Sequence, residues 1–336
     1  MAELSNQLLP VAVLAYLTAM VGYLFEYAFG GRGLVARTAS RPARDLVGAS
    51  VAGSSFGLRD DPDAAVPVSP IEPARTALAP RPAGRAATAG VIAVWFTGLA
   101  VVAHAAVLVT RGLAAGRVPW GNMYEFVLAL SLVGALTWLG LVLARPALRP
   151  LGLFVTLALV LILCFAGMVL YTEAAPLVPA LNSYWLKIHV SAAAVSSGIL
   201  LMGFVPAALF LIRSAYDKGR RSFPASIGAR LPEAGTLERL TFRLHAFAFP
   251  IWTFAVICGA IWAEAAWGRY WNWDPKETWS FVSWVAYAAY LHARATPSVK
   301  RTVATWFAVA AWITMVINLY VINFVAVGLH SYAGVE

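Results

Sequence analysis

The sequence predicts an all-α, polytopic membrane protein with about eight transmembrane helices and both termini outside. Of its 336 residues, 60% are hydrophobic and only 12% are charged, about half the charged fraction of a typical soluble chain. Apolar runs of roughly 20 residues, the length that crosses a bilayer as a helix, recur along most of the chain. Lipid offers no hydrogen-bond partners, so each run must pair its backbone groups internally, as a helix does.

The eight predicted spans follow one another in order along the chain. They cover residues 8–29, 89–110, 122–143, 151–172, 188–212, 246–265, 277–293 and 303–325. The first run lacks the basic start and the small-residue cleavage site of a signal peptide, so residues 1–29 are expected to remain as a transmembrane anchor. The seventh run is the weakest by hydropathy, because it is rich in Trp, Tyr, Ser and Ala.

Basic residues predict the orientation of these spans. Twenty of the 25 Lys and Arg residues lie in alternate connections, namely 30–88, 144–150, 213–245 and 294–302. Cytoplasmic connections are enriched in Lys and Arg, so this set is predicted to be cytoplasmic. The net charge of +9 then reflects membrane topology, and no nucleic-acid partner is expected.

Composition divides the chain further. Residues 30–88 are rich in Ala, Pro, Ser, Asp and Arg with almost no aromatic residues, which predicts a disordered cytoplasmic loop. Residues 89–336 form the predicted membrane domain. Within it, TLERLTFRLHAF, residues 236–247, is amphipathic and could lie on the membrane surface. The two cysteines sit in apolar runs without a CxxC motif, so thiol redox chemistry by this chain is not expected.

A tryptophan-rich segment lies between the sixth and seventh predicted spans, on the outside. Residues 267–279 read WGRYWNWDPKETW and hold four of the chain's 13 tryptophans. Asp274 followed by Pro275 predicts a helix start, because Asp is favoured at the cap and Pro at the first helical position. Glu277 then falls in the first turn. The aromatic side chains of the segment are Trp267, Tyr270, Trp271, Trp273 and Trp279.

Two interpretations of this segment are open. Its rings could form an interfacial aromatic belt, which is common in membrane proteins. They could also receive a broad, flat, apolar ligand with a metal centre, and haem fits that description. Arg269 or Lys276 would then pair with a haem propionate.

Two histidines are candidate ligands for the haem iron. His189, in LNSYWLKIHV, lies at the outer mouth of the fifth span, and His330, in VGLHSY, lies just past the outer end of the eighth. A single interfacial histidine is usually a polar anchor. Two that flank an aromatic segment on the same membrane face predict a pair of neutral imidazoles at the axial positions of iron.

The other three histidines lie elsewhere. His292, near the cytoplasmic end of the seventh span, is a functional candidate because ionisable groups inside spans usually are. Its neighbour Arg294 leaves a simple interfacial position open as well. His104 and His245 are expected to be structural.

A polar cluster, RVPWGNMYEF at residues 117–126, marks another outer boundary. Asn122 could cap the third span, with Glu125 in its positive first turn. Support of an external pocket, with Trp120 as part of its wall, is the alternative.

The stretch WGRYWNWDPKETWSFVSWVAYAAYLHAR resembles the tryptophan-rich WWD signature of the haem-handling membrane proteins of cytochrome c biogenesis. The length, the eight spans, PWGNMYEF and LNSYWLKIHV resemble the CcsA (ResC) branch of system II. This resemblance covers about residues 90–335, and segment 30–88 has no counterpart in it.

The resemblance implies roles for individual residues. His189 and His330 match two external haem ligands, and His292 matches the histidine of an inner haem site. The partner of His292 would come from a CcsB/ResB-type membrane protein. Trp267, Trp271, Trp273 and Asp274 fall on the signature itself.

The implied function is that of a haem-handling subunit of a cytochrome c synthase in the plasma membrane, with its active face extracytoplasmic. Haem b would be its ligand and substrate. Its partners would be membrane lipid, apocytochrome c with its CxxCH segment, and a thioredoxin-like thiol–disulfide protein. Whether the chain is itself an enzyme stays open. The alternatives are an electron-transfer cytochrome b, which usually carries two histidines on one span, and a secondary transporter with a polar midplane site.

Overall fold

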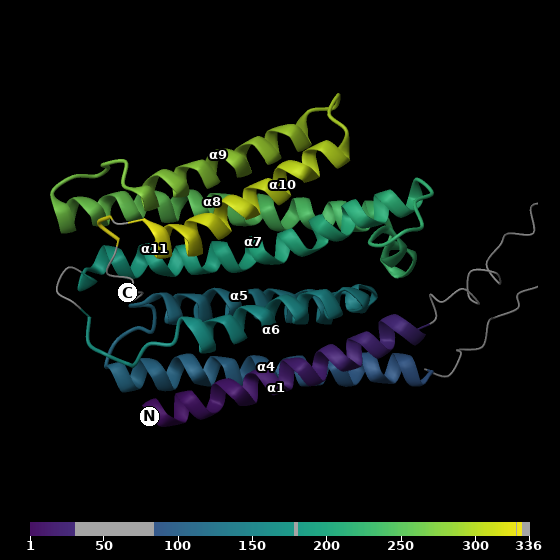
Figure 1. The fold of residues 1–336 in the computed structure, drawn as a ribbon, viewed down its shortest axis with the longest axis horizontal. Helices are drawn as coiled ribbons and strands as arrows, with labels where there is room; N and C mark the ends of the chain where they lie inside the picture. Colours follow the sequence, from purple (N-terminus) through teal and green to yellow (C-terminus); the bar gives the residue numbers. More distant parts are fainter. Residues whose placement is uncertain (31–83, 178–180, 327, 331–336) are drawn as a thin grey trace, which may run out of the picture.

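The computed structural model describes residues 1–30, 84–177, 181–326 and 328–330, and all regular structure in these ranges is helical (Figure 1). The long helices are α1 (Ala2–Phe29), α4 (Arg85–Ala115), α5 (Met123–Ala144), α6 (Gly152–Val169), α7 (Tyr184–Asp217), α8 (Ala234–Trp267), α9 (Pro275–Ala295) and α10 (Arg301–Val316). A π-helical turn, Ile317–Val321, joins α10 to α11 (Ile322–Val325). Short 3-10 helices cover Pro146–Leu151 and Ala225–Arg230. The predicted all-α class is confirmed.

Among the described helices, seven spans are long and apolar enough to cross a membrane: α1, α4, α5, α6, α7, α8 and the α10–α11 unit. Helix α9 does not meet the same hydropathy criterion, as its Trp, Tyr and Ser content predicts, but it runs alongside the others (Figure 1). The chain is therefore a multi-pass membrane protein, and α9 is the most polar of its long helices.

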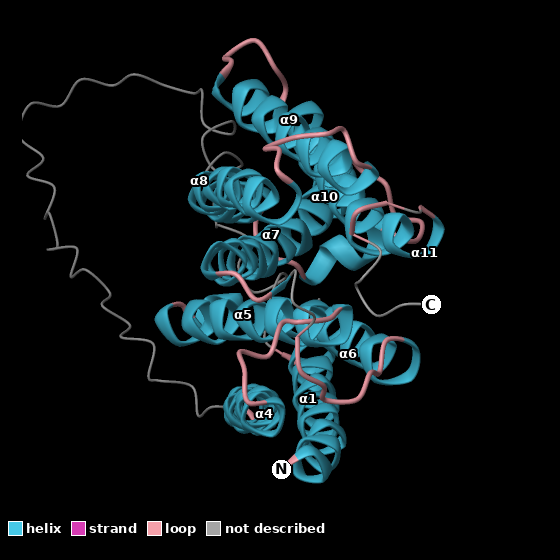
Figure 2. Cartoon of the chain, turned by 90° about the vertical axis from the view of Figure 1, so that its left-hand side faces the viewer, coloured by secondary structure: helices cyan, strands magenta, loops and turns pink. Residues whose placement is uncertain are grey.

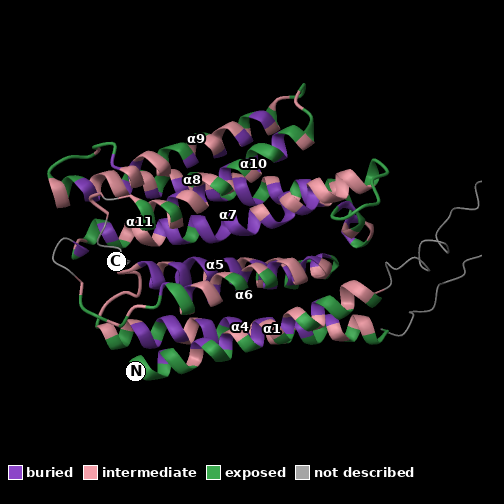
Figure 3. Cartoon of the chain, in the orientation of Figure 1, coloured by how far each residue is buried: buried purple, intermediate pink, exposed green. Residues whose placement is uncertain are grey.

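The helices pack as neighbouring pairs. Helix α1 lies along α4, α7 along α8, and α9 along α10, with α5 and α6 between the first pair and the rest (Figures 1 and 2). Buried residues concentrate on α5 and α7 (Figure 3). These two helices approach closely at Gly198, where an added Cβ would collide with the backbone of Leu130 and Gly134. Small residues at such crossings are the usual way to bring membrane helices together.

The two ends of the bundle differ. Met1, the loop 268–274 and residues 328–330 lie at one end, here called the pocket end (Figure 1). The connection 218–233 and the loop 296–300 lie at the other, here called the opposite end. The predicted grouping of the tryptophan-rich segment with His330 is thus observed. Which side of the membrane each end faces stays a prediction.

The structure differs from the sequence-based expectation at two places. Residues 85–88 belong to α4 and not to the predicted loop 30–88, because the helix starts after Gly84, whose backbone is extended. The rest of that loop, residues 31–83, lies outside the described residues. The amphipathic stretch 236–247 does not form a separate surface helix. It is the first part of α8, continuous with the span, because its buried side chains pack into the bundle.

Candidate functional site

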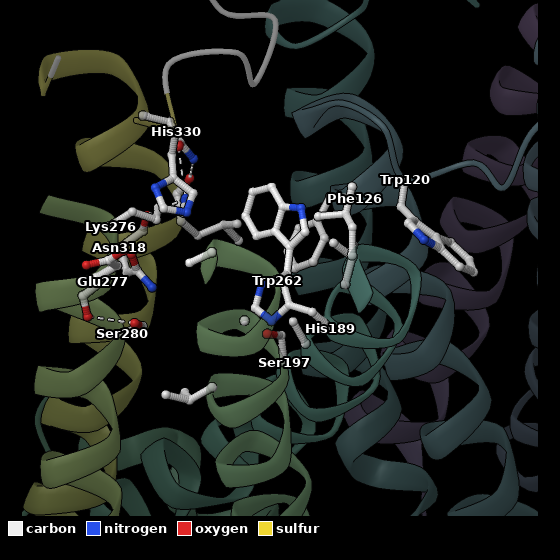
Figure 4. A pocket seen from close by; sticks show the side chains of 18 of the residues that line it. Trp120, Phe126, His189, Ser197, Trp262, Lys276, Glu277, Ser280, Asn318 and His330 are labelled. Atoms are coloured by element: carbon white, nitrogen blue, oxygen red, sulfur yellow. Dashed lines mark hydrogen bonds between the residues drawn. The ribbon is translucent and has the colours of Figure 1, made fainter. Parts of the chain in front are cut away.

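A large cavity opens at the pocket end and runs inward between α7, α8, α9 and α10, with the start of α5 as a further wall (Figure 4). It encloses about 1340 Å³ of empty space, including its open mouth. Its lining includes predicted site residues from four separate parts of the chain: Trp120, Asn122, His189, Tyr270, Trp271, Lys276 and His330. Most of the other lining side chains are apolar.

His189 enters the cavity from the second turn of α7. Its Nδ1 lies 2.7 Å from the backbone carbonyl oxygen of Ala255 on α8. A carbonyl only accepts, so Nδ1 carries the proton and Nε2 is the nitrogen with the lone pair in the neutral ring. Gly259 makes room for this ring, because a Cβ there would lie 2.8 Å from two of its atoms.

His330 reaches the same cavity from the chain beyond α11. Its Nδ1 donates to Asp274 Oδ1 at 2.9 Å, and the N–H of Leu329 donates to Asp274 Oδ2 at 2.7 Å. Burial alone would raise the pKa of the Asp274 carboxyl. Hydrogen bonds from His330, Leu329 and the N–H of Lys276 outweigh burial and hold that pKa below its usual 3.8. A carboxylate bonded to one imidazole nitrogen is how metal-ligating histidines are commonly oriented.

Trp262 brings the two histidines together. The His189 ring stacks on its indole, with 6.3 Å between ring centroids and 11° between planes. The His330 ring meets the same indole edge-on at 5.9 Å, and Trp267 contacts both Trp262 and His330. Sequence reasoning missed Trp262 because it falls inside the sixth apolar run. Its position five residues before Trp267 was the one feature of the sequence that could have identified it as part of the site.

The start of α9 confirms the predicted helix cap. Asp274 caps the helix, Pro275 is its first residue, and Glu277 completes a capping box. The Glu277 carboxylate accepts from the N–H of Asn272 at 2.8 Å and of Asp274 at 3.2 Å. Trp273, between these two N–H groups, takes a left-handed backbone with φ of 58°, which is unusual for a bulky residue. The loop is therefore fixed by α9's own first turn.

Lys276 is a half-buried lysine in the wall of the cavity. Its Nζ donates to the backbone carbonyl of Asn318, in the π-helical turn, and to Asn323 Oδ1, each at 2.9 Å. Both acceptors are uncharged, and no carboxylate lies within salt-bridge distance of Lys276 in the described parts of the chain. Withdrawing an ammonium from water with only neutral partners costs stability, which points to a functional reason for a lysine here.

The cluster at residues 117–126 forms the wall on the α5 side. Asn122 caps α5 by accepting from the N–H of Glu125, as predicted. The fully buried Glu125 carboxylate binds Arg111 at 2.9 Å and Arg117 at 2.6 Å. These arginines also donate to the carbonyls of Thr172 and Ala175. Asn122 is therefore both cap and pocket wall, whereas Glu125 lies behind the wall and fixes it.

Other predicted residues lie away from the cavity. Arg269 and Trp273 are exposed and do not line it, and neither does Trp279. His292 is exposed on α9, toward the opposite end. His245 is fully buried there, between Tyr287 and Tyr290, and its Nδ1 lies 2.7 Å from the Thr241 carbonyl oxygen. His104 is buried beside Tyr16.

The cavity suits a wide, flat, mostly apolar ligand with a metal centre. Its walls are rich in aromatic rings, and two oriented imidazoles reach it from different parts of the chain. The described residues contain no cluster of three or more His, Cys, Asp or Glu side chains that would hold a bare metal ion. Two oriented imidazoles in an aromatic-walled cavity are a donor set that haem iron can use.

Comparisons with known proteins agree with this geometry. A family model described as "Cytochrome C assembly protein" matches residues 120–330. The cytochrome c biogenesis protein CcsA of Guillardia theta is 34% identical over 258 residues, which cover 70% of this chain and 83% of that protein. CcsA of Prochlorococcus marinus is 34% identical over 250 residues, 67% of this chain and 78% of that protein. CcsA of Oryza sativa is 34% identical over 263 residues, 67% of this chain and 81% of that protein. The chain therefore belongs to the cytochrome c assembly protein family, as a CcsA-type membrane protein of cytochrome c biogenesis.

Proposed function

We propose that this protein holds haem at the extracytoplasmic face of the plasma membrane, between His189 and His330, and presents it for attachment to apocytochrome c. One observation carries the proposal. Two imidazoles that lie far apart in the sequence contact the same indole, that of Trp262. Each has its Nδ1 bonded to an acceptor, so that Nε2 is the nitrogen suited to iron.

Lys276 is the better of the two predicted partners for a propionate. It lines the cavity, whereas Arg269 is exposed outside it. An ammonium has three N–H donors, and Lys276 uses two of them on Asn318 and Asn323. The third can bind a carboxylate through a charge-assisted hydrogen bond.

The attachment reaction belongs to haem and to the client protein, and this chain positions the reactants. Each of two client cysteines adds its S–H across one haem vinyl group. A C–S bond and a C–H bond form as the S–H bond and the vinyl π-bond are consumed, so no net electrons are needed. The client thiols must arrive reduced, which is the task of a thioredoxin-like partner. Release then requires the client histidine to replace His189 or His330 on the iron.

Haem supply would involve the opposite end of the molecule. His292 is an exposed ionisable residue on α9, the most polar of the long helices. Such a group is costly against lipid, which favours its coverage by a companion membrane protein of the CcsB/ResB type. The second ligand of an inner haem would come from that companion.

The absorption spectrum of the purified protein tests the proposal. We expect wild-type protein to carry haem with the spectrum of a six-coordinate, low-spin iron, and a His189→Ala/His330→Ala variant to lose it. A folded wild-type protein that stays colourless after haem is added would refute haem binding and favour a transporter. A double variant that keeps the low-spin spectrum would refute this ligand pair and favour an electron-transfer haem elsewhere.

A further inference from the structure

A π-helical turn between α10 and α11 precedes His330 in the chain. Residues Ile317–Val321 form this turn, α11 ends at Val325, and His330 follows five residues later. A π turn inserts one extra residue into the helix. Since each residue turns an α-helix by about 100°, losing the insertion would redirect everything beyond it. The turn therefore sets the direction of α11, which leads toward His330.

Lys276 is bonded to the π turn. Its Nζ donates to the carbonyl of Asn318 inside the turn and to the side chain of Asn323 just beyond it. The Asn318 carbonyl lies where the regular α-helical hydrogen-bond ladder is interrupted. Asn323 in turn donates its amide to Met123 Sδ on α5 at 3.0 Å. The lysine thus links α9 to the turn, and Asn323 links the turn to α5.

The same first turn of α9 also holds His330. Asp274 accepts from Leu329 N and from His330 Nδ1, and Asp274 and Lys276 are two residues apart. Figure 4 shows Lys276, Asn318 and His330 grouped at the same wall of the cavity. Asp274 fixes the orientation of the imidazole, and Lys276 fixes the helix that leads to it.

We propose that Lys276 is a positioning residue for His330, acting through the π turn and Asn323 before any ligand binds. This rests on the proposed function and extends it, because Lys276 then has a second role besides pairing with a propionate. Without the lysine, the π turn loses its external donor and His330 coordinates iron poorly, although its own bond to Asp274 is intact.

A haem without free carboxylates separates the two roles. Purified apoprotein is titrated with haem and, in parallel, with haem dimethyl ester, and the six-coordinate low-spin fraction is measured. For Lys276→Met we expect a shift toward five-coordinate iron with both ligands and about a tenfold loss of affinity for the dimethyl ester, as for other losses of support behind a metal ligand. The loss should be larger for haem, because its propionate also loses a partner. Asn323→Leu should reproduce the shift. Lys187→Met, the same substitution at an exposed residue, should match wild type.

A readout without ligand completes the test. In the apoprotein, Lys276→Met should raise amide hydrogen exchange across residues 317–330 by several-fold and leave α7 unchanged. If Lys276→Met weakens binding of haem but not of its dimethyl ester, the lysine serves the propionates alone and the positioning role is overturned. Unchanged binding of both ligands overturns it too. A wild-type protein that binds neither ligand refutes the proposed function itself.

Discussion

The two ends of the bundle use the same residue type in opposite ways. At the pocket end, His189 and His330 come from different segments, share the ring of Trp262, and line one cavity. At the opposite end, His245 is sealed between Tyr287 and Tyr290, and His292 faces outward. His189 and His245 each have Nδ1 hydrogen-bonded to a backbone carbonyl, so an oriented imidazole alone does not identify a ligand site. Convergence on a cavity distinguishes the candidate site.

The largest expected effect comes from removing the converging imidazoles. His189→Ala/His330→Ala should abolish haem retention in purified protein, because both axial nitrogens are gone, whereas His245→Ala should retain the haem. Absorbance at the Soret band per protein measures this. Added imidazole should restore part of the signal in the double variant. Equal loss in His245→Ala would break the distinction between the two ends.

The second largest effect should be a difference in unfolding free energy between ion pairs at the two ends. Glu125→Gln leaves Arg111 and Arg117 buried without their carboxylate, and such a loss costs about 3–5 kcal/mol of unfolding free energy. Asp217→Ala removes the partly exposed pair with Arg213 near the opposite end, which should cost less than about 1 kcal/mol. Denaturant-induced unfolding in detergent measures both. Similar values would contradict the structural role assigned to Glu125.

The carboxylate behind His330 should tune iron binding. Asp274→Ala should weaken haem affinity about 10–100-fold, as for other partners of ligating histidines. Asp274→Asn should reduce haem affinity less, because asparagine keeps a helix cap and a hydrogen-bond acceptor. The folded-state pKa of Asp274 lies below 3.8, so its stabilisation is complete above pH 3.8 and is lost as the pH falls through the lower folded value. Haem titrations and acid unfolding of Asp274→Asn check both points.

Two glycines offer a matched test of the comparison. Gly259→Ala would press on His189, and Gly203→Ala would place a Cβ 2.5 and 2.7 Å from atoms of His245. Each should lower stability by about 1–3 kcal/mol through overpacking. Only Gly259→Ala should also shift the haem spectrum, because His189 lines the cavity and His245 does not. A spectral change in Gly203→Ala would mean that the two ends are coupled.

The smallest expected effect is at His292. His292→Ala should leave haem binding unchanged when haem is added to the purified protein, since this side chain is exposed and outside the cavity. In cells with the companion protein, the same variant should lower haem loading. If the purified His292→Ala variant bound haem more weakly, His292 would contribute to haem binding in the cavity, contrary to this prediction.

Much of the fold was predictable because membrane helices follow local rules. Apolar length gave the positions of the long helices, and the Trp, Tyr and Ser content of residues 277–293 identified the most polar one. The caps at Asn122 and Asp274 were predictable from adjacent residues. Helix ends reached into polar sequence in α7 and α8, where packing continues a helix that hydropathy would have ended.

The site was predictable only in outline. The tryptophan-rich segment and the two histidines are visible as motifs, but Trp262 falls in an apolar run and could not be told from a core residue. The outward position of Trp273 depends on Glu277 holding the N–H groups on both sides of it. The burial of Lys276 depends on a π turn 42 residues later. Such features arise from rotation and crossing of helices, which local sequence does not specify.

The sequence by itself determined which segments are helical, where α9 begins and which residues have the chemistry to hold haem, because apolar length, capping and side-chain type are local properties. The tertiary structure alone decided that His189 and His330 meet at Trp262, that Asp274 orients His330, and that Lys276 supports the turn leading to it. Those contacts join residues far apart in the chain, and they exist only once the helices have packed at a fixed rotation and depth.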